Sequence, residues 1–208
     1  MELETYIVNA FADAPGRGNR AGVVLSREHP AEEVMQVLAC DIGASETAFV
    51  APEGQSWNIR WFSPLKEMPL CGHATLAASR VLFGKEPWSD LLVFRYAGGI
   101  LQARRHSDDS IGIDFPLDEY LQCPPDPVFN DFFGPLQLRD CIYGQRTKKV
   151  VLVASDGTDL ADIVPDFRRM AEYRGFCSNG IAITKASSVF DFESRYFNPW
   201  AGVNEDPV

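Results

Sequence analysis

The sequence predicts an α+β protein of two related halves, each made of strands around a central helix, with the second half incomplete. Residues 60–64 (RWFSP) and 195–199 (RYFNP) share one pattern of Arg, aromatic residue, Phe, small polar residue and Pro. Each run follows a strand-like stretch and precedes an acidic residue and a further proline. Residues 72–83 are apolar nearly all round, so this helix should be enclosed and should be the most buried element of the first half.

The first half is expected to consist of short strands, one outer helix and the enclosed helix. Glycine and proline punctuate the loop at 13–19, and Gly43 is placed to end the outer helix that starts at Pro30. The Gly-x-Gly of that loop opens no helix, so it does not match a dinucleotide-binding turn. Strands are expected at residues 4–12, 21–26, 45–51, 57–62, 91–96, 100–105 and 110–115.

A proline-rich run at 116–135 is the expected boundary between the halves, which we place at 1–118 and 119–208. In the second half, Pro165 should bend or break a helix predicted over 159–174. The strands expected there are residues 139–143, 149–154, 180–185 and 190–197.

Composition excludes several classes of protein. The chain has 208 residues, 46% of them hydrophobic, which is enough for packed cores. Its net charge of -10 argues against binding to nucleic acid or to anionic membranes. No apolar run has the length of a membrane span and the N-terminus has no signal-peptide pattern, so we expect a cytoplasmic protein.

The cysteines favour reduced thiols over disulfides or a metal site. Five are present, which is an odd number, and no two form a CxxC pair. We therefore expect mostly buried, reduced side chains and no structural zinc. The five are Cys40, Cys71, Cys123, Cys141 and Cys177.

Residues 70–75 (LCGHAT) are the first candidate for a functional site. They follow a proline turn and open the enclosed helix, where backbone N–H groups can bind an anion such as a carboxylate. Gly72 would let the ligand approach closely; alternatively, it serves only a tight strand-to-helix turn. Cys71 could be an activated thiol or a small packing residue.

Glu46 and His73 are candidates for proton transfer. Glu46 starts a strand among small and apolar residues, and partial removal from water would raise its pKa toward neutral pH. His73 lies in the first turn of the enclosed helix, where its neutral form could donate a hydrogen bond or relay a proton. An ordinary surface glutamate and a core histidine bonded to backbone are the alternatives.

Three motifs resemble the PhzF-like family of phenazine-biosynthesis isomerases and relatives, which share the diaminopimelate epimerase fold. They are residues 43–49 (GASETAF), residues 62–64 (FSP) with 67–77 (EMPLCGHATLA), and residues 202–208 (GVNEDPV). The resemblance implies two pseudo-symmetric domains, each with a curved, mostly antiparallel sheet around a central helix, and an active site between them. It also implies proton transfer without a cofactor or metal.

The resemblance also implies roles for particular residues. Glu46 matches the general base and acid, and His73 and Asp206 match residues that line the site and assist proton movement. Gly72 and His73 match the carboxylate-binding turn. Other residues in or beside the matched motifs are assigned to substrate binding: Asn19, Ser45, Cys71 and Ala74. The expected ligand is a small carboxylic acid, and the expected assembly is a homodimer.

Two departures from the family pattern affect these expectations. Gly18-Asn19-Arg20 stands where relatives usually have Gly-Asn-Pro. The pattern of relatives also continues past Val208 into a second anion-binding turn and a second central helix. We therefore expect the second half to be incomplete, with exposed or chain-covered apolar surface near Val208, and the 208-residue chain to be a poor catalyst. The alternative function is a weak or inactive relative that serves as a binding or dimer-forming module.

Overall fold

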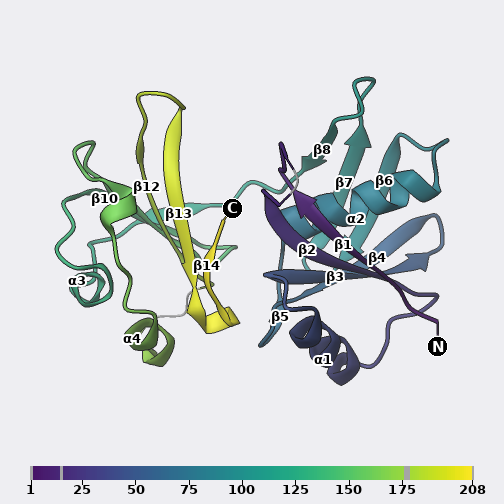
Figure 1. Cartoon of the computed structure of the whole chain (residues 1–208), viewed down its shortest axis with the longest axis horizontal. Helices are drawn as coiled ribbons and strands as arrows, with labels where there is room; N and C mark the ends of the chain where they lie inside the picture. Colours follow the sequence, from purple (N-terminus) through teal and green to yellow (C-terminus); the bar gives the residue numbers. More distant parts are fainter. Residues whose placement is uncertain (1, 15, 176–178, 208) are drawn as a thin grey trace. The chain divides into compact units, whose positions relative to one another are not determined.

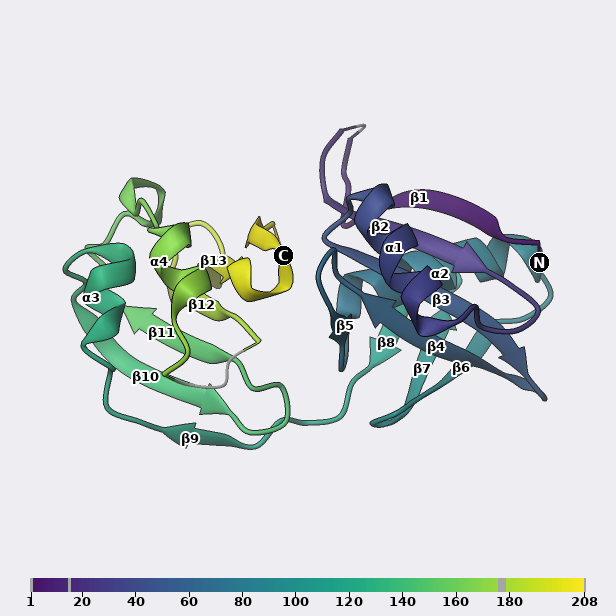
Figure 2. The same ribbon diagram turned by 90° about the horizontal axis from the view of Figure 1, so that it is seen from below.

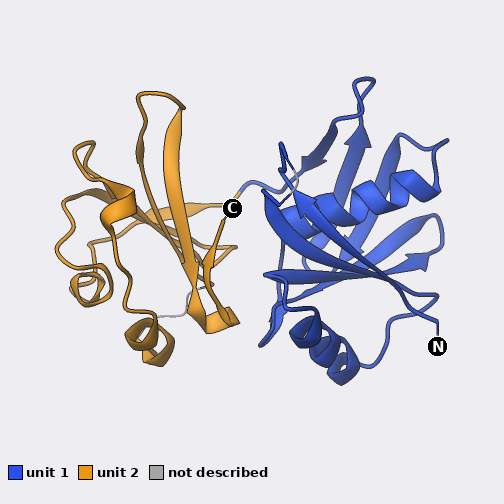
Figure 3. Cartoon of the chain, viewed as in Figure 1, with its two compact units in different colours: residues 1–117 blue, residues 118–208 orange. Residues whose placement is uncertain are grey.

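The chain folds as two units, each with its own sheet (Figure 3). The computed structural model describes residues 2–14, 16–175 and 179–207. The units are Met1–Leu117 and Asp118–Val208, so the division lies one residue from the boundary expected at 118/119. The expectations for Cys177 and Val208 fall outside the described residues.

The first unit contains an eight-stranded, mostly antiparallel sheet. Its strand order is β1-β2-β3-β4-β6-β7-β8, with β5 paired to β4. The neighbours β2 and β3, and β4 and β6, run parallel. The strands are β1 (Glu4–Ala10), β2 (Asn19–Leu25), β3 (Glu46–Glu53), β4 (Ser56–Phe62), β5 (Glu67–Met68), β6 (Leu91–Tyr96), β7 (Gly99–Arg105) and β8 (Ile111–Asp114).

Helix α2 (Gly72–Lys85) is the central element of this unit, as its apolar circumference predicts. It contacts β1, β2, β3, β7 and β8, and the sheet curves around it (Figure 1). Eight of its 14 residues are buried, including Leu82 and Phe83. The expectation that it is the most buried element is wrong, because six of the seven residues of β2 are buried. A central strand has a neighbour on each edge and packing on its faces, whereas the C-terminal part of α2 reaches solvent.

Helix α1 (Glu32–Ile42) lies against β3 and β4. Met35 and Ala39 are its buried residues, and they pack with Val24, Phe49 and Phe62. Gly43 ends the helix in the left-handed conformation, with φ of 62°, as the sequence predicts. This sharp stop directs the chain into β3, whose first residue is Glu46.

The second unit contains a six-stranded sheet in the order β14-β13-β12-β11-β10-β9, with only β11 and β12 parallel. Helices α3 (Val128–Phe133) and α4 (Phe167–Glu172) cover one face of it (Figure 2). A short 3-10 helix, Leu160–Asp162, precedes α4, and another, Pro199–Ala201, precedes β14. The strands are β9 (Tyr120–Gln122), β10 (Leu138–Gly144), β11 (Val150–Ala154), β12 (Ile181–Ala186), β13 (Phe192–Asn198) and β14 (Val203–Asp206).

Several elements were not expected from the sequence. The proline-rich run taken as a boundary contains β9 and α3, and α3 buries Phe129, Phe132 and Phe133 in the core of the second unit. The helix expected over 159–174 is two short pieces on either side of Pro165, which agrees with a break there. The strands β5 and β14 are too short for a period-2 pattern to reveal.

The repeated sequence pattern corresponds to a repeated structure. Arg60 on β4 donates two 2.7 Å hydrogen bonds to the carboxylate of Glu67 on β5, and its guanidinium lies over the ring of Phe62. Arg195 on β13 binds Glu205 on β14 at 2.7 and 2.8 Å and lies over Phe197. Such paired bonds fix both partners in one orientation. The pKa of Arg195 is raised, mainly by its hydrogen bonds to Glu205.

The repeat extends to the strands beside these pairs. Thr47 of β3 lies opposite Phe62, and Ile181 of β12 lies opposite Phe197. Glu46 comes directly before Thr47, and Gly180 comes directly before Ile181. Glu46 in the first unit and Gly180 in the second therefore occupy equivalent positions of the repeat. Gly180 has a φ of 131°, and a Cβ there would clash with the ring of Tyr196.

Among the described residues, none of the helices combines the length and the apolar character needed to cross a bilayer.

Candidate active site

Glu46 lies at the start of β3 with its side chain in the interior of the first unit. Its residue is only 6% exposed. The strand runs parallel to β2, and Glu46 lies opposite Ala21. Thr47 and Ala48, which follow it, are fully buried. The alternative of an ordinary surface glutamate therefore does not describe this residue.

The N-terminus of α2 meets Glu46 from a different part of the chain. Cys71 is the extended N-cap, and its side chain makes no capping hydrogen bond. The first turn contains no acidic residue, so the positive end of the helix dipole meets no carboxylate of its own helix there. This end of a 14-residue helix has the charge and the donors that suit an anionic ligand.

Two residues hold this turn in place, Thr75 from the candidate run 70–75 itself and Trp61 from outside it. Thr75 donates a 2.6 Å hydrogen bond from its hydroxyl to the carbonyl of Cys71. Trp61 on β4 donates from its indole to the same hydroxyl at 3.1 Å. Both residues are buried, so these hydrogen bonds hold the first turn of α2 on its buried side. Trp61 lies in the repeated RWFSP run, and a polar indole in a buried strand was the signal that could have indicated this contact.

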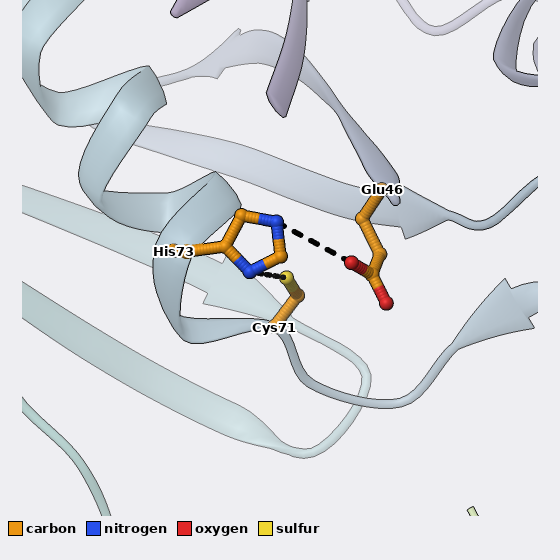
Figure 4. Close-up of side chains that lie close together, drawn as sticks. All are labelled: Glu46, Cys71 and His73. Atoms are coloured by element: carbon orange, nitrogen blue, oxygen red, sulfur yellow. Dashed lines mark hydrogen bonds and ion pairs between the residues drawn. The ribbon is translucent and has the colours of Figure 1, made fainter. Parts of the chain in front are cut away.

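His73 joins the two parts of the site (Figure 4). Its Nε2 lies 3.3 Å from Oε2 of Glu46, and its Nδ1 lies 3.6 Å from Sγ of Cys71. The hydroxyl of Ser45 also lies 3.0 Å from Nε2. All three side chains that meet in Figure 4 are buried. The structure thus brings together Glu46, His73, Cys71 and Ser45 as the sequence motifs indicate.

The hydrogen bonds of Ser45 assign the proton on His73. The Ser45 hydroxyl can donate one hydrogen bond. Two carbonyl oxygens lie within reach as acceptors, Oδ1 of Asn19 at 3.1 Å and the backbone oxygen of Arg20 at 3.3 Å. A hydroxyl that donates to one of these two oxygens accepts toward His73, and this corresponds to a neutral ring with its proton on Nε2. That single N–H then lies between two acceptors, the Ser45 hydroxyl at 3.0 Å and the Glu46 carboxylate at 3.3 Å, and Nδ1 is left to accept from the Cys71 thiol.

This assignment gives Cys71 a positioning role that substitution can test. We expect Cys71→Ala to lower turnover about tenfold, because Nδ1 loses its donor and the ring is less well oriented. Cys71→Ser retains a donor and should keep most of the activity. The comparison is made by measuring kcat and KM for both variants at several pH values. Equal losses for Ala and Ser would contradict the hydrogen-bond role and favour the alternative of Cys71 as a packing residue.

Asn19 reaches the site because of Gly18. Gly18 has a φ of 82°, and a Cβ there would clash with the backbone of Ala10 and Ala12. The chain therefore turns tightly into β2, and Asn19 is buried at its first position. The residue that follows is Arg20 in place of the usual proline, and Asn19 still lies beside Ser45.

The remaining predicted residues are placed as follows. Gly72 and Ala74 lie in the first turn of α2, where Ala74 is fully buried and can contribute through its backbone. Asp206 ends β14 in the second unit, is 6% exposed and lies opposite Tyr196. In the repeat it occupies the place of Met68, which lies opposite Trp61. The role of Asp206 stays a prediction.

The arrangement fits a hydrogen-bonded relay better than a metal site. Donor atoms of Glu46, Cys71 and His73 lie within 4.8 Å of one another. However, Cys71 and Glu46 contact opposite nitrogens of the His73 ring (Figure 4). An ion held by one of these nitrogens would face only one of the two other ligands, whereas a zinc site converges its ligands on one point.

Comparison with known proteins identifies the family. Residues 8–208 match the family model of phenazine biosynthesis-like proteins, PhzC-PhzF. An uncharacterised isomerase of Pseudomonas aeruginosa is 38% identical over 209 residues, covering 100% of this chain and 78% of that protein. The crystal structure of a PhzF-family phenazine biosynthesis protein from Enterococcus faecalis is 33% identical, with a TM-score of 0.78, over 100% of this chain and 78% of that one.

A more distant structure extends the likeness of fold. A predicted epimerase of Pseudomonas aeruginosa is 17% identical, with a TM-score of 0.72, over 97% of this chain and 75% of that one. The α+β, epimerase-like fold expected from the sequence is therefore confirmed. By its motifs, its fold and the match over residues 8–208, the chain belongs to the PhzC-PhzF family of phenazine biosynthesis-like proteins.

Proposed function

We propose that this protein is an isomerase that shifts a proton on a carbon next to a carboxyl or carbonyl group of a small carboxylic acid. The observation that carries the proposal is the buried Glu46 carboxylate, 3.3 Å from Nε2 of His73 and beside the N-terminal turn of α2. The 38% identical isomerase of Pseudomonas aeruginosa supports the reaction class. The acid itself is not specified by these residues, and a phenazine intermediate is one candidate.

In the proposed reaction, the turn at residues 71–74 binds the substrate carboxylate. Backbone N–H groups of Gly72 and Ala74 and the helix dipole favour a negative charge at this position. When the proton leaves carbon, the electron pair moves onto the neighbouring carbonyl or carboxyl oxygen. The same donors then stabilise the larger charge on that oxygen, which is how fixed dipoles lower a barrier.

Glu46 takes the proton from carbon and returns it to the product. As a carboxylate, Glu46 forms a new O–H bond while the C–H bond of the substrate breaks. As a carboxylic acid, it then returns the proton either to the same carbon or to a second carbon of the substrate. His73 donates from Nε2 to the carboxylate and holds it in one orientation. No cofactor is needed in this scheme, because the substrate's own carbonyl group accepts the electron pair.

The screen that tests the proposal measures exchange with solvent. The chain is incubated in D2O with a panel of small carboxylic acids, and NMR follows loss of the signal from the proton next to the carboxyl group. We expect exchange for at least one unsaturated or amino-substituted acid. If every acid in a broad panel keeps its protons while the chain remains folded, the isomerase proposal is wrong.

Gly72→Ala separates a role in binding from a role in folding. Gly72 does not have a positive φ, and an added Cβ would meet only the Phe115 ring at 3.5 Å, which is ordinary contact. The alternative of a glycine required by a tight turn is thus not favoured. We expect an unchanged Tm and a roughly tenfold weaker affinity for the carboxylate, since a methyl group beside the first-turn amides blocks close approach. Calorimetry measures both quantities, and a large fall in Tm would favour the structural role.

Asp206→Asn tests the remaining predicted catalytic residue. If Asp206 assists proton movement, the variant should lose activity with little change in Tm, because asparagine keeps the size of the side chain. Solvent exchange and thermal unfolding of the same sample give the two values. Full activity in the variant would remove Asp206 from the proposed mechanism.

A further inference from the structure

Two thiols of the second unit face each other outside the candidate active site. Cys123 follows β9 directly and Cys141 lies in β10. Gln122 pairs with Ile142, so the next residues along, Cys123 and Cys141, lie directly opposite each other across the antiparallel pair. The amide of Cys123 donates to the carbonyl of Cys141 at 2.9 Å, and the two sulfur atoms are 3.4 Å apart.

This geometry suits a covalent link. Directly opposed residues of antiparallel strands have Cα atoms about 4.5–5.5 Å apart, within the roughly 4.4–6.8 Å range found for disulfides. The sulfur atoms need to approach by little more than an ångström to reach the bonded distance of about 2.05 Å. The backbone pairing is already made, so no strand has to move to bring the residues together.

The pair is also accessible. Cys123 is partly exposed, whereas Cys141 is buried. Both lie in the wall of a cavity of about 370 Å³, which is otherwise mainly apolar. Its other lining residues include Leu121, Phe129, Tyr143 and Val150. A small reagent can therefore reach Cys123 first.

Burial raises the pKa of Cys141 to about 12, and its hydrogen bond with Cys123 acts in the same direction. Cys141 thus keeps its proton at neutral pH. Because the thiolate is the reactive form of cysteine, the first attack falls to the more exposed Cys123. Cys123 is therefore the attacking thiol, and Cys141 is the thiol that reacts with it in the second step.

We propose that Cys123 and Cys141 form a reversible dithiol–disulfide site whose oxidant is a low-molecular-weight disulfide. The thiolate of Cys123 attacks one sulfur of the reagent, a mixed disulfide forms, and one thiol leaves. The thiolate released in this first exchange takes the proton of Cys141 as Cys141 attacks Sγ of Cys123, and the second thiol leaves as a thiolate that is protonated by water. Two protein thiols are oxidised and one disulfide is reduced to two thiols.

The link would constrain the start of the second unit. It closes the chain from Cys123 to Cys141 into a ring that contains α3, and it ties the edge strand β9 to β10. A ring of this length should shift the thermal midpoint of the second unit upward by on the order of 10 °C. The site concerns stability and does not depend on the proposed isomerase reaction.

Glutathione disulfide is the probe for the test. The reduced, folded full chain is incubated with it, remaining thiols are alkylated, and peptides are mapped by mass spectrometry. We expect a peptide that joins Cys123 to Cys141 and a higher Tm, both reversed by dithiothreitol. Cys40→Ser is the matched control, since Cys40 is exposed on α1 of the first unit, and it should give the same linked peptide.

Single variants test the order of attack. Cys141→Ala should stop at glutathione on Cys123, whereas Cys123→Ser should leave Cys141 unmodified in the folded protein. The wild-type map decides the proposal even if a variant fails to fold. If Cys40 takes up glutathione while Cys123 and Cys141 are both recovered as alkylated thiols, or if oxidation leaves Tm unchanged, the proposal is overturned.

Discussion

Replacing Glu46 by glutamine is expected to abolish proton exchange while the fold survives. Glutamine keeps the shape of the side chain and can still accept a hydrogen bond from Nε2 of His73, which lies 3.3 Å from Oε2 of Glu46. It cannot take a proton from carbon. General acid–base catalysis contributes about 10²–10⁴-fold, so the rate should fall by roughly a thousandfold or more. Exchange in D2O measures the rate, and thermal unfolding verifies the fold.

Glu53→Gln is the matched control for this variant. Glu53 ends the same strand, β3, and is exposed, so the same chemical change is made away from the site. It should keep the exchange rate of the unsubstituted chain. If Glu46→Gln retained a comparable rate, Glu46 would not be the proton carrier, and a different base would have to be sought.

Phe197→Ala is expected to destabilise the second unit strongly. Phe197 is fully buried, and its ring centroid lies 5.4 Å from that of Phe133 and 6.2 Å from that of Phe167. Loss of a buried phenylalanine ring removes these contacts and leaves a cavity, which costs roughly 3–5 kcal/mol. Arg195 also loses the ring beneath its guanidinium. Urea denaturation and hydrogen exchange of the β11–β13 amides measure the change.

Phe192 supplies the control on the same strand. Its residue is 64% exposed, so Phe192→Ala removes a ring that has little contact to lose. The free energy of unfolding should change by no more than about 0.5 kcal/mol. Similar losses for the two variants would show that the core of the second unit does not depend on the repeated Phe.

The sequence predicts the elements of the fold best where one period dominates. Helix α2 is apolar around its circumference, and β6 and β7 flank a glycine turn, so their limits are close to those expected. The run 116–135 contains the boundary between the units as expected, but β9 and α3 within it are not predicted, because prolines and aspartates dominate the run. The three buried phenylalanines of α3 outweigh that local signal, since tertiary packing stabilises a six-residue helix that propensity alone would not.

The candidate site is predictable in its residues but not in its geometry. The motifs that contain Glu46 and His73 lie 27 positions apart, and only the folded β3 and α2 show that the side chains meet. The proton assignment on His73 depends on Ser45 and Asn19, and no spacing rule encodes such contacts. The thiol pair at Cys123 and Cys141 was hidden in the same way, because register places the two residues opposite each other.

The glycine at position 180 has a stereochemical consequence. It repeats the position of Glu46, and its crowding against Tyr196 leaves no space for a side chain. A racemase with two opposed bases removes hydrogen from one face of the substrate and adds it to the other, but here the repeat-related position offers no second carboxylate. In the proposed reaction Glu46 is then the group that both removes and returns the hydrogen, with Asp206 only assisting, and hydrogen would leave and return on one face. A substrate carrying deuterium at the reacting carbon should therefore pass part of its label into the product.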